Sequence, residues 1–412
     1  MREMKNSGIA WIGKIPKEWG IVKFKYLHNG LNTGEAIDKE YWESDAGLNA
    51  FYTAGLTPIR TGYSNFPTWK ETGENDLLLA RNGTPYVYLP VSKAYYTDHI
   101  IRAAMSSLVN RRFIRYCLQQ SIASIAVDSV SIPTWSATLW NNQILTWPSV
   151  IEQERIAAFL DAECAEIDAV LEKTRASIEE YKKLKQAVIT QAVTKGIRGD
   201  RPMKHSGIEW IGDIPAEWDV LNLVAHTSML TPMRDRPENL DGPIPWVRIE
   251  DFEGKYIESS KAGLGVSMKT VKEMNLKVYP VGTILCTSSC IMGKCAIVSR
   301  ELVSNQRFIG IIPDRTTDKT YLYYLMTSNA ERMNFLSTGA LQANLSRSAF
   351  EHLKVQFPPY SEQQEIAAYL DDKCADIDAL VAKKQQYLTE IENYKKSLIY
   401  EYVTGKKEVH PL

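Results

Sequence analysis

The chain has 412 residues, 44% hydrophobic and 24% charged, a composition that excludes disorder throughout and is ordinary for two or three domains. The formal net charge is −1, so bulk charge neither indicates nor excludes binding to nucleic acid. No apolar run approaches the ~20 residues of a membrane-spanning helix. The first residues, MREMKNSGIAW, lack the apolar core of a signal peptide, and the six cysteines form no dense framework. These features predict a cytoplasmic protein.

Two blocks of sequence occur twice, in the same order. Residues 4–19 (MKNSGIAWIGKIPKEW) match residues 203–218 at 12 of 16 positions. Residues 152–169 (EQERIAAFLDAECAEIDA) match residues 362–379 at 12 of 18 positions. Such a repeat predicts a duplicated scaffold, with a mixed domain at 1–150, a long helix at 151–198, a second domain at 199–360 and a second helix at 361–412. Because the segments between the matched blocks differ, we expect the scaffold to do one common job and the two segments to do different ones.

The two long helices carry an apolar seam at alternating spacings of four and three residues. Such a seam is typical of coiled-coil packing. The predicted seam residues are Leu160, Ile167, Leu171, Ile178 and Val188 in the first helix, and Leu370, Ile377, Val381, Leu388 and Leu398 in the second.

Charge along these helices predicts their relative direction. Residues 152–172 hold seven acids and one base, whereas residues 173–198 hold seven bases and two acids, and the second helix repeats this gradient. Antiparallel pairing would set acidic halves against basic halves, whereas parallel pairing would oppose like charges. We therefore expect an antiparallel coiled-coil spacer about 65 Å long, with pseudo-twofold symmetry. The alternative is a long helix buried inside one ordinary domain.

The segments at 20–147 and 219–357 are rich in short apolar runs separated by turn residues. Strands are predicted at 76–80, 86–91, 283–287, 294–299 and 308–313, and helices near 111–126 and 320–335. The overall class is therefore α+β, with two mixed α/β domains joined by the long helices.

Sequence-specific contact with nucleic acid uses Arg, Lys, Asn, Gln, Ser and Thr side chains, many of them on loops. The candidate DNA-binding residues in the first segment are Arg60, Arg81, Asn82, Thr84 and Arg102. Those in the second are Arg234, Arg236, Lys294, Asn305, Gln306 and Arg307. For each residue alone, a solvated surface charge or a turn position is the competing interpretation.

Motifs for catalysis are missing from the sequence. It contains no G-x-x-x-x-G-K-[ST] phosphate loop, and no Ser–His–Asp or Cys–His set can be nominated. Cys286, Cys290 and Cys295 lie close together, but no second cysteine pair or nearby histidine completes a zinc site, so buried strand cysteines are the simpler interpretation. We expect a non-catalytic chain that binds neither metal nor cofactor itself.

The repeated opener MKxSGIxWIGxIPxEW, the helix start EQxxIAxxLD and the duplicated order of variable segment and helix resemble the specificity (S, HsdS-type) subunit of type I restriction-modification enzymes. The resemblance covers essentially the whole chain. It implies that each variable segment is a target recognition domain reading one half of an asymmetric, bipartite site on double-stranded DNA. It also implies that the helices set the gap between the half-sites and dock two copies of the modification (methyltransferase) subunit, with a restriction (translocase and nuclease) subunit joining them.

By the same resemblance, S-adenosylmethionine, ATP and magnesium belong to the partner subunits. The resemblance weakens before the first helix, where Pro133, Thr134 and Trp135 stand opposite Ala343, Asn344 and Leu345. Two other functions stay open: a coiled-coil adaptor whose two heads bind proteins, and a self-sufficient nuclease or methyltransferase, which the missing motifs disfavour.

Overall fold

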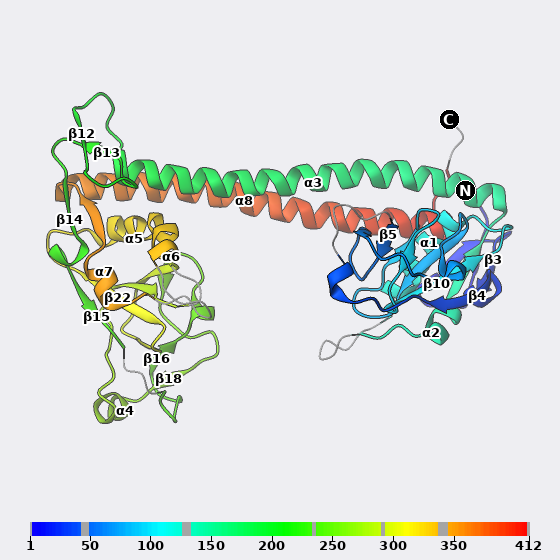
Figure 1. Ribbon diagram of the computed structural model, residues 1–412, viewed down its shortest axis with the longest axis horizontal. Helices are drawn as coiled ribbons and strands as arrows, with labels where there is room; N and C mark the ends of the chain where they lie inside the picture. The colour runs from blue at the N-terminus through cyan, green and yellow to red at the C-terminus, as the bar shows by residue number, and fades with distance from the viewer. Residues whose placement is uncertain are drawn as a thin grey trace. The chain divides into compact units, whose positions relative to one another are not determined.

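The computed structural model describes residues 2–42, 49–125, 133–232, 236–289, 293–336 and 345–409 (Figure 1). The chain forms two compact units. Unit 1 comprises residues 1–175 and 386–412, and unit 2 comprises residues 176–385. Each unit therefore holds part of both long helices, α3 (Val150–Lys195) and α8 (Tyr360–Val403). Among the described residues, no helix is both long enough and apolar enough to cross a membrane.

The remaining elements of unit 1 are mostly short strands. They are β1 (Met4–Asn6), β2 (Lys14–Pro16), β3 (Gly20–Lys23), β4 (His28–Thr33), β5 (Asn49–Tyr52), β6 (Ile59–Thr61), β7 (Asp76–Ala80), β8 (Val87–Tyr88), β9 (Tyr95–Tyr96), β10 (Ile100–Met105), α1 (Arg111–Ala123), α2 (Ala137–Asn141) and β11 (Ile144–Trp147), with 3₁₀ turns η1 (Phe24–Tyr26), η2 (Lys39–Tyr41) and η3 (Thr68–Lys70).

Unit 2 has a similar series of elements. They are β12 (Met203–His205), β13 (Asp213–Pro215), β14 (Asp219–Asn222), β15 (Thr227–Leu230), β16 (Ile244–Val247), β17 (Tyr256–Ile257), β18 (Gly265–Val266), α4 (Met268–Glu273), β19 (Ile284–Thr287), β20 (Cys295–Val298), β21 (Val303–Ser304), β22 (Phe308–Pro313), α5 (Lys319–Ser328), α6 (Ala330–Leu336), α7 (Arg347–Glu351) and β23 (Lys354–Phe357), with 3₁₀ turns η4 (Leu223–Ala225) and η5 (Ile249–Asp251).

The main sheets of the two units share a strand order. In unit 1 the order is β4-β10-β7-β8, and in unit 2 it is β15-β22-β19-β20-β17. Smaller sheets, β6-β5-β9 and β18-β16-β21, also correspond. The strands predicted at 76–80, 283–287 and 308–313 are β7, β19 and β22. The two variable segments thus fold alike although their sequences differ.

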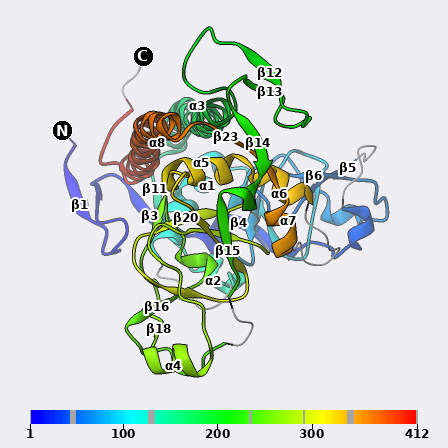
Figure 2. The same ribbon diagram turned by 90° about the vertical axis from the view of Figure 1, so that its left-hand side faces the viewer.

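A short hairpin and a two-stranded ladder join each variable segment to the scaffold. The first and last strands of each segment pair with each other, β3 with β11 and β14 with β23. The repeated opener forms the hairpins β1–β2 and β12–β13, and Figure 2 shows the latter projecting away from the main sheet of unit 2.

Glu152 and Glu362, at the starts of the two long helices, bond to the repeated openers, which explains why the two blocks repeat together. Trp19 Nε1 donates to Glu152 Oε2 at 2.9 Å, and Trp218 Nε1 donates to Glu362 Oε2 at 3.0 Å. Arg2 pairs with Glu152, and Arg201 Nη1 lies 2.6 Å from Glu362 Oε1. Glu362 is only 2% exposed, and a buried carboxylate is stable only when paired in this way. The repeated Glu, Trp and Arg therefore form one joint, built once in each unit.

The helices run antiparallel within each unit. In unit 1, Lys395 Nζ lies 2.6 Å from Asp168 Oδ1 and Arg175 Nη2 lies 2.6 Å from Glu392 Oε1. In unit 2, Lys185 Nζ lies 2.6 Å from Asp378 Oδ2. Of the predicted seam residues, six are buried and four are half-buried; the buried ones are Leu160, Leu171, Ile178, Leu370, Ile377 and Leu398, and the half-buried ones are Ile167, Val188, Val381 and Leu388.

Candidate nucleic-acid interface

The turn between β7 and β8 gathers three of the candidate residues in unit 1: Arg81, Asn82 and Thr84. Gly83 at its centre has φ +73°, a left-handed conformation that favours glycine. Arg81 and Thr84 are exposed, and Asn82 is half-buried. We call residues 81–84 the reader turn of unit 1.

Trp135, about 50 residues later in the chain, makes two hydrogen bonds to the reader turn. Its Nε1 donates to Gly83 O at 2.7 Å, and its backbone N donates to Arg81 O at 2.6 Å. Thr134 forms a β-bridge with Asn82. Asn82 Nδ2 also lies 2.8 Å from His99 Nδ1. These bonds hold the backbone of the turn in place, whereas the side chains of Arg81 and Thr84 are exposed. Such an arrangement is suited to hydrogen bonding with an external ligand.

The corresponding edge of unit 2 uses different side chains on the same backbone pattern. Arg81 N donates to His99 O in unit 1, and Ser288 N donates to Arg307 O at 2.8 Å in unit 2. Trp135 N donates to Arg81 O, and Leu345 N donates to Ser288 O at 2.9 Å. This register pairs Ser288 with Arg81 and Arg307 with His99.

Four candidates of unit 2 border this edge. Lys294, Gln306 and Arg307 are exposed, and Lys294 Nζ lies 6.0 Å from the ring centre of Phe252. Half-buried Asn305 accepts the backbone N–H of Arg307 through Oδ1 at 3.0 Å. We call Ser288, Lys294 and residues 305–307 the reader edge of unit 2.

Arg102 lies away from the reader turn, in the sheet. It belongs to β10, and its Nη1 donates to Glu71 O at 2.6 Å while its Nε lies 3.6 Å from Asp76 Oδ2. Its side chain is 14% exposed. Burial raises the pKa of Asp76, opposed by the Gly73 N–H and by Arg102. In this structure the Arg102 guanidinium is therefore occupied by internal partners.

The other candidates are dispersed. Arg60 is exposed on β6, in the smaller sheet of unit 1. Arg236 is exposed, and its guanidinium lies 5.7 Å from the ring centre of Trp246. Arg234, Cys290 and Asn344 lie outside the described residues.

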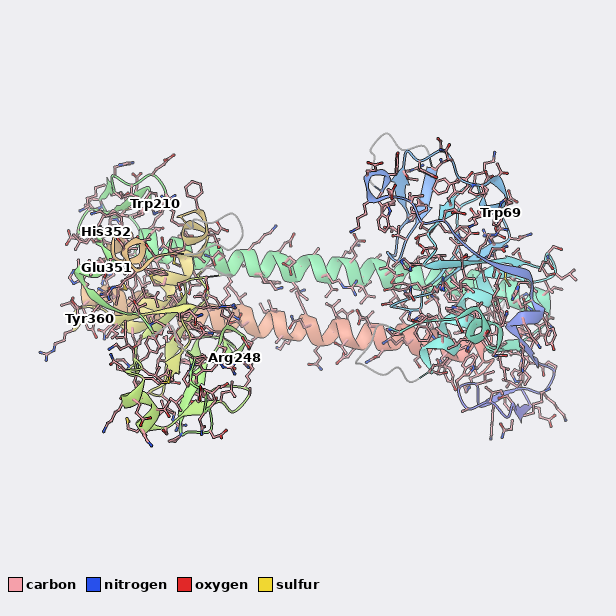
Figure 3. The ribbon with its side chains drawn as sticks, turned by 60° about the horizontal axis from the view of Figure 1, so that its bottom comes forward. Trp69, Trp210, Arg248, Glu351, His352 and Tyr360 are labelled. Atoms are coloured by element: carbon pink, nitrogen blue, oxygen red, sulfur yellow. The ribbon has the colours of Figure 1, made fainter. Side chains whose placement is uncertain are left out.

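Sequence reasoning missed several residues at these edges. His99 and Ser288 were not nominated because they reach these edges only when the strands pair, and Thr134 was considered equally as a helix cap and as a DNA contact. Trp69 on η3 was also missed, although it is 61% exposed on the surface of unit 1 (Figure 3). Its ring centre lies 4.9 Å from Lys70 Nζ, and exposed aromatic rings next to basic side chains are where unpaired bases stack in proteins that bind single-stranded nucleic acid.

Cys286 and Cys295 face each other on neighbouring strands β19 and β20. Their Sγ atoms lie 2.7 Å apart, and both side chains are buried. Burial raises the pKa of the Cys286 thiol well above its ordinary value. Among the described residues, no group of three or more His, Cys, Asp or Glu could hold a metal ion.

Comparison with known proteins shows similarity to the specificity subunits of type I restriction enzymes. Residues 219–392 match the model of the type I restriction modification DNA specificity domain. The MjaIX specificity subunit of Methanocaldococcus jannaschii is 36% identical over 173 residues, which span 39% of this chain and 40% of that protein. The MjaVIII specificity subunit of the same organism is 22% identical over 435 residues, covering 97% of this chain and 95% of that one.

A solved structure extends the likeness to the fold. A chain described under "Structural basis underlying complex assembly and conformational transition of the type I R-M system" has a TM-score of 0.71 and 13% sequence identity. It covers 95% of this chain and 99% of its own length. At that identity, the likeness is one of fold.

Proposed function

We propose that this chain, which belongs to the HsdS-type specificity subunits of type I restriction-modification systems, reads a bipartite DNA site, one half-site with each unit. Specificity subunits are the non-catalytic members of these enzymes. The partners that this role requires are double-stranded DNA and the other subunits of the system. We assign DNA reading to the reader turn of unit 1 and the reader edge of unit 2.

One observation carries the proposal. The two units use the same strand order and the same Trp–Glu–Arg joint, yet they present different polar side chains at equivalent edge positions. Arg81 and His99 in unit 1 stand where Ser288 and Arg307 stand in unit 2. Different donors and acceptors on equivalent backbones are what two different half-sites require.

We also propose that α3 and α8 act as an antiparallel coiled-coil spacer in a pseudo-twofold repeat. The 46 residues of α3 correspond to about 69 Å at ~1.5 Å per residue, which exceeds one DNA turn of about 34–36 Å. Such a spacer can hold readers over half-sites that are separated by uncontacted base pairs.

The helices would also dock two modification subunits, and a restriction subunit would join them. S-adenosylmethionine, ATP and magnesium would be bound by those partners and not by this chain.

The decisive experiment is a genome-wide methylation map of cells that express the chain with its modification subunit, compared with cells that lack the chain. We expect a new split motif with a fixed gap, methylated on adenine. No new methylation, with the partner active and bound, would favour a protein-binding adaptor. Filter binding under a salt titration separates the two further, because a DNA reader loses affinity steeply as salt rises.

Insertion of one heptad into both long helices tests the spacer. The seam keeps its register after seven residues, so both units should still fold. The gap in the methylated motif should lengthen while both half-sites stay the same. An unchanged gap would show that the helices do not set it.

A further inference from the structure

Each recognition domain contacts its own long helix with one helix of its own, which we call its reader helix. These helices are α1 in unit 1 and α5 in unit 2, and both begin at a capping side chain, Asn110 and Asp318 respectively. Figure 1 shows α5 lying beside α8. The sequence repeat does not extend into these helices, so a shared attachment there is unexpected.

The first contact point lies at the start of the reader helix. Asn110 N donates to Gln153 Oε1 at 3.2 Å, and Asp318 N donates to Gln363 Oε1 at 2.8 Å. Both glutamines are almost fully buried, and each also donates through Nε2 to the proline carbonyl five residues before it. Their amide groups are therefore fixed in one orientation.

The second contact point lies six residues further along the reader helix. Tyr116 OH donates to Asp161 Oδ1, and Tyr324 OH donates to Asp371 Oδ1, both at 2.7 Å. Burial raises the pKa of both phenols, so each is a protonated donor at neutral pH. Hydrogen bonds between a hydroxyl and a carboxylate are among the stronger ones in proteins.

The cations that neutralise the two carboxylates differ. In unit 1, Arg112 and Arg115 of α1 lie 3.0 and 3.3 Å from Asp161. In unit 2, Lys255 approaches Asp371 Oδ1 at 2.5 Å from the residue preceding β17, the edge strand of the main sheet. The phenol and the carboxylate are thus common to both units, whereas each recognition domain supplies its own cation.

The two points together restrain direction. The glutamine and the aspartate are eight residues apart on the long helix, or about 12 Å at ~1.5 Å per residue. These two hydrogen bonds add a directional restraint to the apolar core that α1 and α5 share with the long helices, because apolar packing is non-directional whereas a hydrogen bond fixes the positions of its donor and acceptor. In unit 2, a hollow of about 560 Å³ borders Tyr324 and Asp371, and beside it Leu322 and Leu325 of α5 share a buried core with Leu370 of α8.

The reader helix transmits this angle to the sheet. In unit 1, Phe113 and Cys117 of α1 pack in one core with Leu77 and Leu79 of β7, the strand that leads into the reader turn. In unit 2, Leu322 and Leu325 of α5 pack with Ile284 of β19 in the same way. Because close-packed cores move as bodies, a rotation of the reader helix would turn the reading edge with it.

We propose that Gln153 with Asp161, and Gln363 with Asp371, form a two-point socket on each long helix that sets the angle of an exchangeable recognition domain. Tyr116 and Tyr324 are the positioning residues. This inference rests on the proposed function. Any recognition domain that fits the socket needs a free backbone N–H at its helix cap and a tyrosine six residues later.

Tyr324→Phe tests the socket, using the full chain with its modification subunit and a library of split sites with varied gaps. We expect methylation at the native gap, relative to gaps one base pair longer or shorter, to fall roughly tenfold, because a hydrogen bond to a charged acceptor is worth about that factor or more. Tyr116→Phe, the equivalent change in unit 1, should lower the same ratio by a similar factor. Tyr323→Phe, a matched change one residue away on α5, should leave the ratio unchanged.

Asp371→Asn adds a coupling test. It keeps an oxygen acceptor but removes the charge, and its effect combined with Tyr324→Phe should be smaller than the sum of the two alone. A gap ratio unchanged within twofold, or a uniform loss at every gap with a lower Tm, would overturn the socket. Absence of any split motif with the unsubstituted chain would instead overturn the proposed function.

Discussion

Unit 1 and unit 2 solve the same structural problem with different sequences. Their attachments are alike: a tryptophan indole on a helix-start glutamate, a buried glutamine at the reader-helix cap, and a tyrosine on an aspartate. Their reading edges differ, with Arg81 in one where Ser288 stands in the other. The comparison teaches that buried polar contacts keep their identity where they hold the architecture, whereas exposed side chains vary at the edges that we propose read DNA.

The largest expected effect comes from breaking the joint in unit 2. Glu362→Ala would leave Arg201 and the Trp218 indole without their acceptor, and loss of one partner of a buried pair costs about 3–5 kcal/mol. The unfolding transition of unit 2, followed by calorimetry, should shift accordingly.

Two further variants control for this change. Glu365→Ala, on the same helix face but in a surface pair with Arg198, should cost less than about 1 kcal/mol. Glu152→Ala should destabilise unit 1 by less than Glu362→Ala destabilises unit 2, because the Glu152 side chain is 21% exposed. If Glu362→Ala and Glu365→Ala lower the unfolding temperature of unit 2 equally, the joint stabilises unit 2 no more than a surface ion pair does.

An intermediate effect is expected at the reader turn of unit 1 and the reader edge of unit 2. Arg81→Ala should weaken recognition of one half-site only, and Arg307→Ala that of the other, each by about 1–3 kcal/mol if the side chain contacts a base. Methylation of a library with each half-site randomised in turn would measure this. Lys17→Ala is the control: Lys17 follows β2, pairs with Glu3 and lies outside both reading sites, so neither half-site should change. Loss in both half-sites from one substitution would contradict separate readers.

The smallest effect is expected between the helices. Lys185→Ala removes the exposed ion pair with Asp378, and Lys395→Ala removes its equivalent with Asp168. Each should cost about 0.2–1 kcal/mol, and less at high salt, because exposed pairs are screened by solvent and ions. Thermal unfolding at low and high ionic strength would measure this. A cost well above 1 kcal/mol that persists at high salt would contradict a screened surface pair.

The sequence predicts the long helices and several core strands well because their signals are local. The long helices expected at 151–198 and 361–412 each begin one residue earlier, as α3 and α8, and end earlier than expected, at Lys195 and Val403; β7 occupies its predicted range. The shared strand order of the two variable segments was not predictable, because pairing such as β4 with β10 depends on contacts far apart in the chain.

The site was predicted only in outline for a related reason. Arg102 was nominated by residue type, but residue type does not show that a guanidinium lies inside a sheet beside Asp76. Conversely, His99 and Ser288 reach the reading edges only through strand pairing. Tyr116 and Tyr324 have the same spacing from their helix caps, a regularity visible in the sequence only once the caps are known.

The division of the chain between the units has a consequence for synthesis on the ribosome. Unit 2 is one continuous stretch, residues 176–385, and all of its contacts are available once that stretch has emerged. Unit 1 needs residues 386–412, so its N-terminal part must wait while more than two hundred later residues are made. The domain synthesised first is therefore the one completed last, and Leu398, Ile399 and Val403 are the buried residues that complete its core.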